Sequence, residues 1–182
     1  MLILLPPSEK KAATPGPAIT TYTGVLYAAL GWATLPAAAR KRAQKSITII
    51  SAKYGAIRPL DHIEPYKEKI NNSTMRAPIT KELEAIAAGL IIDCRSSTYQ
   101  GVWTPPFDIT VEIKVMTRVN GVKKVITHMS KKTRGEVVRL ILLQSSEVKT
   151  PGDLLEIISA EYECELFDST GKEPWVLEVI AH

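Results

Sequence analysis

Cysteine is scarce in this sequence, and its scarcity excludes two classes of small protein. Cys94 and Cys164 are the only cysteines among 182 residues, and neither belongs to a CxxC pair or a Cys/His cluster. The pattern therefore indicates neither a disulfide framework nor a structural zinc site. Direct iron binding is disfavoured as well, because the sequence has no clustered His/Cys/carboxylate set. We expect no metal and no other cofactor.

Long apolar runs are missing too. No stretch approaches the roughly 20 apolar residues that a membrane helix needs. The opening run, Met1 to Leu5, is too short for the core of a signal peptide and has no basic region before it. We therefore expect a cytoplasmic protein whose first residues form a strand.

Composition places the chain among ordinary globular proteins. Hydrophobic residues make up 45% and charged residues 23% of the sequence. A chain of 182 residues suffices for one good core, so we expect a single domain over residues 1–182. The formal net charge of +4 permits binding of phosphates or nucleic acid, but it is too small for a protein that coats DNA.

Short apolar runs that empty into polar segments indicate the strands of a sheet. The predicted strands are residues 2–5, 47–50, 90–93 and 125–127. The predicted helices are residues 23–35, 79–90, 132–143 and 152–160. A hairpin of residues 162–167 and 175–180 should end the chain. The pattern predicts an α+β (mixed α/β) fold, with one mixed β-sheet flanked by helices and with hairpins in the C-terminal half.

Another hairpin is predicted in the middle of the C-terminal half. Residues 107–119 alternate apolar and polar side chains, as a half-buried strand does. An Asn-Gly pair at 120–121 supplies type I′ turn chemistry, which folds residues 122–129 back onto that strand. In the register of a two-residue turn, Ile113 faces His128, so we expect His128 on the buried face.

The loops that follow the predicted strands share one chemical character, since all are rich in basic and hydroxyl side chains. Loops at the carboxyl ends of parallel strands meet at one edge of a sheet, where ligands bind. We predict that these loops gather around an anionic ligand. The predicted binding residues are Ser8, Glu9, Lys10, Lys53, Tyr54, Arg58, Tyr66, Lys67, Arg95, Ser96, Tyr99, Lys131, Lys132, Arg134 and Arg139.

The cations among these residues define the centre of the predicted site. One electropositive pocket should contain Lys53, Arg58, Arg95, Lys132 and Arg134, with the hydroxyls of Ser8, Tyr54, Ser96 and Tyr99 as donors and His128 at its floor. Crowded cations repel one another, so interleaved carboxylates or a bound anion must offset the repulsion. The free N–H groups at the start of the helix predicted from Lys132 also favour an anion there.

Each of these groups has a structural interpretation as well. Lys132 and Glu136 can pair on a solvated helix face, Asp93 and Arg95 can form a buried ion pair, and Arg58 can answer Asp61 in a rigid loop. Gly135 admits either a ligand or another backbone. The residue pattern leaves these alternatives open.

Three residues are the candidates for catalysis. Lys53 and Tyr54 suit proton transfer if burial lowers the lysine pKa, and His128 is the third candidate. A lone histidine on an apolar face is more often a hydrogen-bonded core residue. Cys94 follows an apolar strand, where a cysteine is usually buried and inert.

Taken together, the motifs resemble consecutive blocks of the YaaA family of peroxide stress proteins. The blocks are residues 2–10 (LILLPPSEK), 22–27 (YTGVLY), 51–61 (SAKYGAIRPLD), 65–67 (PYK), 93–99 (DCRSSTY) and 128–135 (HMSKKTRG), in the family's order. The resemblance covers nearly the whole chain. It implies a mixed α/β domain with a basic cleft that binds nucleic acid. It also implies protection against hydrogen peroxide by limiting free iron and oxidative damage to DNA, with no agreed reaction.

Two departures from the family pattern bear on the ligand. Family members commonly carry a long helical insertion, with helix-hairpin-helix-like sequence, between the first strand block and the Tyr-x-Gly block. Here residues 11–21 alone fill that interval, so the chain resembles a short variant of the family. Lys67 stands where the family usually has arginine, which keeps the charge but loses the bidentate fork.

Two functional hypotheses follow. The first is a YaaA-like stress-response protein whose basic cleft binds a phosphate-bearing ligand, either DNA or a nucleotide-like molecule. The alternative is an enzyme of unassigned type that acts on a small anionic, nucleoside-like metabolite. Phosphate contacts with DNA weaken steeply with salt, so binding at two salt concentrations separates the hypotheses.

Overall fold

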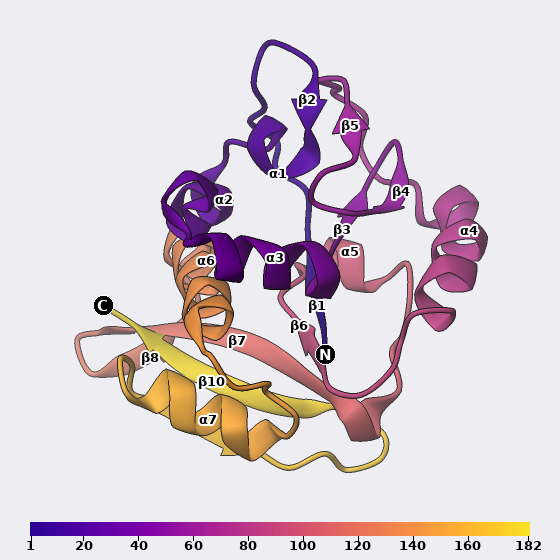
Figure 1. Cartoon of the computed structure of the whole chain (residues 1–182). Coiled ribbons are helices and arrows are strands. Elements are labelled where there is room, and N and C mark those ends of the chain that lie inside the picture. Colours follow the sequence, from indigo (N-terminus) through magenta and orange to yellow (C-terminus); the bar gives the residue numbers. More distant parts are fainter.

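A central sheet organises the computed structural model, which describes all residues from 1 to 182 (Figure 1). Its strand order is β4-β3-β1-β6-β7-β10-β9, and β8 pairs with the end of β7. Neighbours from β3 to β10 run parallel, whereas β4, β8 and β9 each pair antiparallel. The strands are β1 (Leu2–Leu5), β3 (Ile47–Ser51), β4 (Gly55–Ile57), β6 (Ile91–Asp93), β7 (Thr110–Val119), β8 (Val122–Lys124), β9 (Cys164–Phe167) and β10 (Trp175–Ala181). The mixed sheet confirms the predicted fold class.

Helices cover both faces of this sheet. They are α1 (Ala18–Thr21), α2 (Val25–Leu30), α3 (Ala37–Ser46), α4 (Asn72–Glu84), α5 (Ser97–Gln100), α6 (Thr127–Leu143) and α7 (Pro151–Ser159), with the 3₁₀ turns η1 (Trp32–Thr34) and η2 (Phe107–Ile109). A separate two-stranded ribbon pairs β2 (Gly16–Pro17) with β5 (His62–Ile63). None of the helices combines the length and apolar character needed to cross a membrane.

Strand β1 shows why the sheet is covered twice. All four of its side chains are buried. Since successive residues of a strand point to opposite faces, both faces of the sheet must be covered here. Leu2 and Leu4 belong to a smaller core with Ile79 and Leu83 of α4. Ile3 and Leu5 belong to the larger core, which also holds side chains from α2, α3, α6 and α7. In Figure 1, α4 accordingly lies apart from the group of α2, α3 and α6.

The contact between α2 and α6 depends on Gly135. A Cβ atom at this position would lie 2.2 Å from the carbonyl oxygen of Leu26, so only glycine permits this approach. Arg139 secures the same contact, since its Nη1 donates to the carbonyls of Leu30 and Gly31 at 3.0 and 3.1 Å. Of the two possibilities for Gly135, the structure shows close approach of another backbone.

The turn of the hairpin predicted over residues 107–129 is confirmed, but the prediction of its second strand is wrong beyond Lys124. Asn120 and Gly121 have φ angles of 52° and 79°, as a type I′ turn requires, and Val119 pairs with Val122. The ladder stops at Lys124, and the predicted strand at 125–127 is absent because α6 begins at Thr127. His128 consequently lies exposed in the first turn of α6 and not on a buried strand face.

Helix α6 takes the place of the missing strand beside the part of β7 that lies between its pairings with β6 and β8. Arg134 Nε donates to the carbonyl of Ile113 at 3.1 Å, while the Ser130 hydroxyl donates to Ile126 of its own helix at 3.0 Å and lies 3.5 Å from the carbonyl of Val115. The Arg134 side chain thus satisfies a backbone acceptor that another strand would otherwise pair. The hydrophobic pattern after Lys124 is therefore that of a helix docking on a sheet edge.

The other predicted elements differ mainly at their ends. Helix α4 begins at Asn72 because the Asn71 side chain caps it, accepting from Ser73 N at 3.1 Å. The helix predicted at 23–35 breaks where Gly31 adopts φ 63°. Helix α3 was not predicted, whereas α7 and the final hairpin of β9 and β10 are confirmed.

Candidate ligand-binding site

Aromatic rings gather where β1, β3 and β6 end. Five of the six tyrosines lie here, namely Tyr22, Tyr27, Tyr54, Tyr66 and Tyr99. Ring centroids are 5.2 Å apart for Tyr22 and Tyr27, 6.4 Å for Tyr22 and Tyr66, and 5.8 Å for Tyr54 and Tyr66. Burial, and then the neighbouring Tyr66, raise the pKa of Tyr99 to about 12. Burial also raises the pKa of Tyr22 and Tyr27, so these three hydroxyls are neutral at physiological pH.

Two of the tyrosine hydroxyls form a buried hydrogen-bonded chain with the hydroxyl of Ser51. Ser51, the last residue of β3, lies 2.8 Å from the hydroxyl of Tyr66, which lies 2.8 Å from that of Tyr22. Ser51 Oγ also accepts from the backbone N–H groups of Lys53 and Tyr54, at 3.2 and 3.1 Å. Strand β3 thereby fixes the polar floor of the cluster.

Lys11 covers this floor. Its ammonium lies 4.0 Å from the Tyr66 ring centroid and 5.7 Å from that of Tyr22, so it makes cation–π contacts with both. Burial lowers the pKa of Lys11, while nearby Glu68 and Glu9 act in the opposite direction. We name Lys11, Tyr22, Ser51, Tyr54, Tyr66 and Tyr99 the tyrosine site.

The loop after β1 is held rigidly against the start of α2. Ser8 is buried and donates to the carbonyl of Lys10 at 2.7 Å, and the Tyr27 hydroxyl donates to that of Pro6 at 2.7 Å. A Cβ atom on Gly24 would lie 2.2 Å from Ser8 Oγ, so glycine is needed for this contact. Ser8 thus shapes the loop that carries Glu9 and Lys10, whose side chains are exposed.

Lys53 and Tyr54 lie at the rim of the tyrosine site. Lys53 Nζ is 5.2 Å from the Tyr54 ring centroid and 3.9 Å from Glu64 Oε2. The Tyr54 hydroxyl accepts from Glu64 N at 3.2 Å. A hydrogen bond with Tyr54 raises the pKa of Lys53, so the condition for its use as a base, a pKa lowered by burial, is not met. Burial lowers the pKa of Lys11, and not that of Lys53.

Arg58 and Arg95 do not face this site. Arg58 Nη1 donates to the Ile47 carbonyl and the Thr48 hydroxyl, at 3.2 and 2.9 Å, which places the guanidinium at the amino end of β3. The Arg95 side chain is fully buried in a two-point ion pair with Asp93, with distances of 2.9 and 2.8 Å. It also donates to the carbonyls of Tyr99 and Trp103, both at 3.1 Å. Both arginines therefore hold the fold together.

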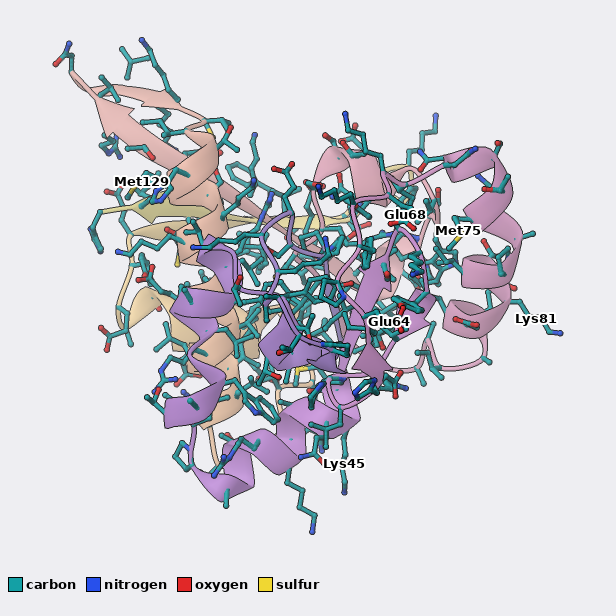
Figure 2. All side chains as sticks on the ribbon, turned by 90° about the horizontal axis from the view of Figure 1, so that it is seen from above. Lys45, Glu64, Glu68, Met75, Lys81 and Met129 are labelled. Carbon is teal, nitrogen blue, oxygen red and sulfur yellow. The ribbon has the colours of Figure 1, made fainter.

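Three of the four lysines and arginines of α6 also have partners within the chain. Lys132 Nζ lies 3.2 Å from Glu136 Oε1, one helical turn away. Arg134 and Arg139 bond to the backbone carbonyls described above. Figure 2, which looks down on the carboxyl ends of the first strands, shows Met129 of α6 on the opposite side of the molecule from Glu64 and Glu68. The five cations thus do not assemble into the single pocket that the sequence predicted.

The remaining predicted residues divide between the site and its surroundings. Tyr66 is buried in the tyrosine site, whereas Lys67 is exposed and donates its N–H to Glu68. Ser96 is half-buried at the start of α5, and Lys131 is exposed on α6. Sequence reasoning missed Lys11, Tyr22 and Ser51 as site residues. The available signals were the second lysine of the Lys-Lys pair and a hydroxyl at the very end of a buried strand.

A hollow of about 200 Å³ lies at the other end of the sheet and is lined mainly by charged side chains. Lys123 pairs with Glu178 and Arg118 with Glu163, so three of its four charged lining residues already have ion-pair partners. No group of three His, Cys, Asp or Glu side chains is placed to hold a metal ion. The tyrosine site is therefore the better candidate for ligand binding.

Comparison with known proteins gives a consistent answer. Residues 6–166 match the family model of "Peroxide stress protein YaaA". A UPF0246 protein of Streptomyces coelicolor is 33% identical over 96% of this chain and 72% of its own length. UPF0246 proteins of Corynebacterium efficiens and Idiomarina loihiensis are 33% and 28% identical over 81% and 86% of this chain. The chain spans 63% and 67% of the lengths of those two relatives.

Proposed function

This chain belongs to the family of peroxide stress protein YaaA, and we propose that it binds a small phosphate-bearing, nucleotide-like ligand at the tyrosine site. Family membership supports a role in the response to peroxide. A cytoplasmic location remains a prediction from the sequence and forms part of this proposal.

The observation that carries the proposal is the combination of rings and lysines at one edge of the sheet. Tyr54 and Tyr99 are half-buried, so part of each ring faces outward. An aromatic ring stacks with a nucleobase for about 1–3 kcal/mol, largely independent of the base. Lys10 and Lys53 lie exposed nearby, and an ammonium suits a phosphate as a point charge. A planar ring with an anionic tail matches both features.

DNA binding is the second candidate, and a different surface favours it. Between residues 113 and 135 the sequence has lysines and arginines but no acidic residue. Lys124 of β8 and Lys131 of α6 are exposed and have no ion-pair partner, whereas Lys123 and Lys132, also exposed, pair with Glu178 and Glu136. Contacts between such lysines and phosphates would release counterions and weaken with salt.

The enzyme hypothesis stays a proposal with revised candidates. His128 is exposed at the start of α6, and Lys53 has a raised pKa, so neither is prepared for proton transfer. Turnover of a nucleoside-like metabolite would instead involve the groups of the tyrosine site, where Lys11 has a lowered pKa.

Calorimetric titration tests these proposals directly. We expect AMP to bind the wild-type protein more tightly than adenosine, because the phosphate adds contacts with lysine. A 20-base-pair DNA should bind with an affinity that falls steeply between low and high salt if the α6 surface is used. Failure of AMP, inorganic phosphate and adenosine to bind would overturn the small-ligand proposal.

The peroxide role is tested in cells. Expression of the wild-type chain in a bacterial strain that lacks its own family member should raise survival after hydrogen peroxide. Variants of the tyrosine site should lose this protection while they accumulate to the same level. Equal protection by these variants would separate the peroxide role from ligand binding.

A further inference from the structure

The buried hydroxyls of Ser51, Tyr66 and Tyr22 carry three protons, but only two hydrogen bonds join them. Ser51 Oγ accepts from two backbone N–H groups, which uses both of its lone pairs. It must therefore donate its own proton to a tyrosine, and Tyr66 is 2.8 Å away. One tyrosine proton then makes the bond between Tyr66 and Tyr22. The proton of the other tyrosine has no acceptor in the protein.

This surplus proton lies in a place where water has little access. Tyr22 is 1% and Tyr66 is 7% exposed. A buried donor without an acceptor is costly, and native proteins rarely leave one unpaired. The pair of tyrosines is thus complete only when an acceptor from outside the chain reaches it.

Lys11 identifies the charge of that acceptor. Its ammonium lies over the rings of both tyrosines, so a group that accepts the surplus proton also meets a cation. Glu68 and Glu9 lie near enough to influence Lys11, yet desolvation dominates and lowers its pKa. The carboxylates in the free protein therefore compensate the ammonium incompletely.

We infer that Lys11 and the Tyr22–Tyr66 hydroxyl pair form a seat for an oxyanion, the phosphate or carboxylate group of the ligand. This inference rests on the proposed function and names the residues that receive the anionic end. An anionic oxygen would accept the surplus proton in a charge-assisted hydrogen bond, which is stronger than one between neutral groups.

Titration of wild-type and variant proteins with inorganic phosphate, acetate, AMP and adenosine tests the seat. Lys11→Met should weaken phosphate and AMP binding about tenfold or more and leave adenosine unchanged. Tyr22→Phe leaves the surplus proton on Tyr66, and Tyr66→Phe leaves one on Tyr22 and also frees the proton of Ser51, so each single variant should weaken phosphate only partly. The double variant removes both tyrosine hydroxyls and should weaken phosphate about tenfold or more.

Matched controls exclude general effects of charge and of tyrosine removal. Lys45→Met removes an exposed lysine of α3, which Figure 2 shows away from Glu64 and Glu68. Tyr162→Phe removes a hydroxyl that donates to Glu136 at 2.8 Å, remote from the site. Both should bind every probe as the wild type does. Lys11→Arg keeps the charge and should retain part of the phosphate affinity.

The outcomes separate this inference from the proposed function. If Lys11→Met and the double tyrosine variant bind AMP as tightly as the wild type, the seat is wrong while nucleotide binding stands. If acetate binds and phosphate does not, the seat holds for a carboxylate and the phosphate part of the proposed function fails. If no probe binds the wild type, both fail. Should the double variant unfold, the comparison of Lys11→Met with Lys11→Arg still decides.

Discussion

Substitution of Gly135 by alanine sets two known effects against each other. In a helix interior, alanine is favoured over glycine by about 1 kcal/mol, so local propensity alone predicts a more stable protein. The packing against α2 predicts the opposite. A Cβ atom at position 135 would lie 2.2 Å from Leu26 O, 2.9 Å from Ala29 Cβ and 3.0 Å from Leu26 C.

The contacts decide the sign, because none of these three atoms can rotate away. Each belongs to the backbone of α2 or is fixed directly to it, so the two helices must separate by about the deficit in distance. Overpacking of a well-packed core costs roughly 1–3 kcal/mol, and a clash with backbone lies at the upper end. After the propensity gain is subtracted, Gly135→Ala should lower the free energy of unfolding by about 2 kcal/mol.

Urea denaturation followed by circular dichroism measures this difference. Gly152→Ala is the matched control, since Gly152 lies in α7 and its added Cβ would come no closer than 3.7 Å, to Thr150 Oγ1. The control should be neutral or slightly stabilising. A Gly135→Ala variant as stable as the wild type would refute the argument that α2 and α6 meet through this glycine.

Three further predictions follow from buried groups. The free energy of unfolding should fall as pH rises above 10, because tyrosines of the unfolded chain lose their protons there. In the folded protein, burial raises the pKa of Tyr99 to about 12 and raises the pKa of Tyr22 and Tyr27 further. Urea denaturation at pH 9, 10 and 11 measures the decline. Arg95→Met should cost about 3–5 kcal/mol, since it leaves the Asp93 carboxylate buried and unpaired, and Asp93→Asn combined with Arg95→Met should recover part of the loss in the same assay. Cys94 should resist thiol reagents and hydrogen peroxide in the folded protein, because burial raises its pKa to about 12, and mass spectrometry should find modification only after unfolding.

Sequence reasoning succeeded where a local pattern carries its own geometry. The Asn-Gly turn at 120–121 requires positive φ angles, which almost no other pair adopts easily, so its place in the chain was predictable. The fully apolar run of β1 likewise indicates a strand that is buried on both faces. Such elements are specified by a few adjacent residues.

Prediction from the sequence failed where contacts with residues far along the chain determine the secondary structure. After Lys124, an apolar pattern continues, and local preference cannot tell a returning strand from a helix that docks on the same edge. The decision depends on Ser130 and Arg134, whose side chains reach the carbonyls of β7 and are themselves placed only by the helix. His128 was misplaced as a direct result of this choice.

The same limit explains the candidate site. The sequence shows that arginines and lysines follow the strands, but it does not show which acceptors each of these side chains donates to. Arg95 uses four of its five N–H donors on Asp93 and two carbonyls, whereas Lys11 has only rings beneath it and carboxylates nearby. A cation that still has unused capacity to bind an anion is more informative than a conspicuous basic run. By that measure we expect the binding capacity of this fold to lie with Lys11 and the tyrosines, and the arginines of the motifs to serve mainly in holding the fold together.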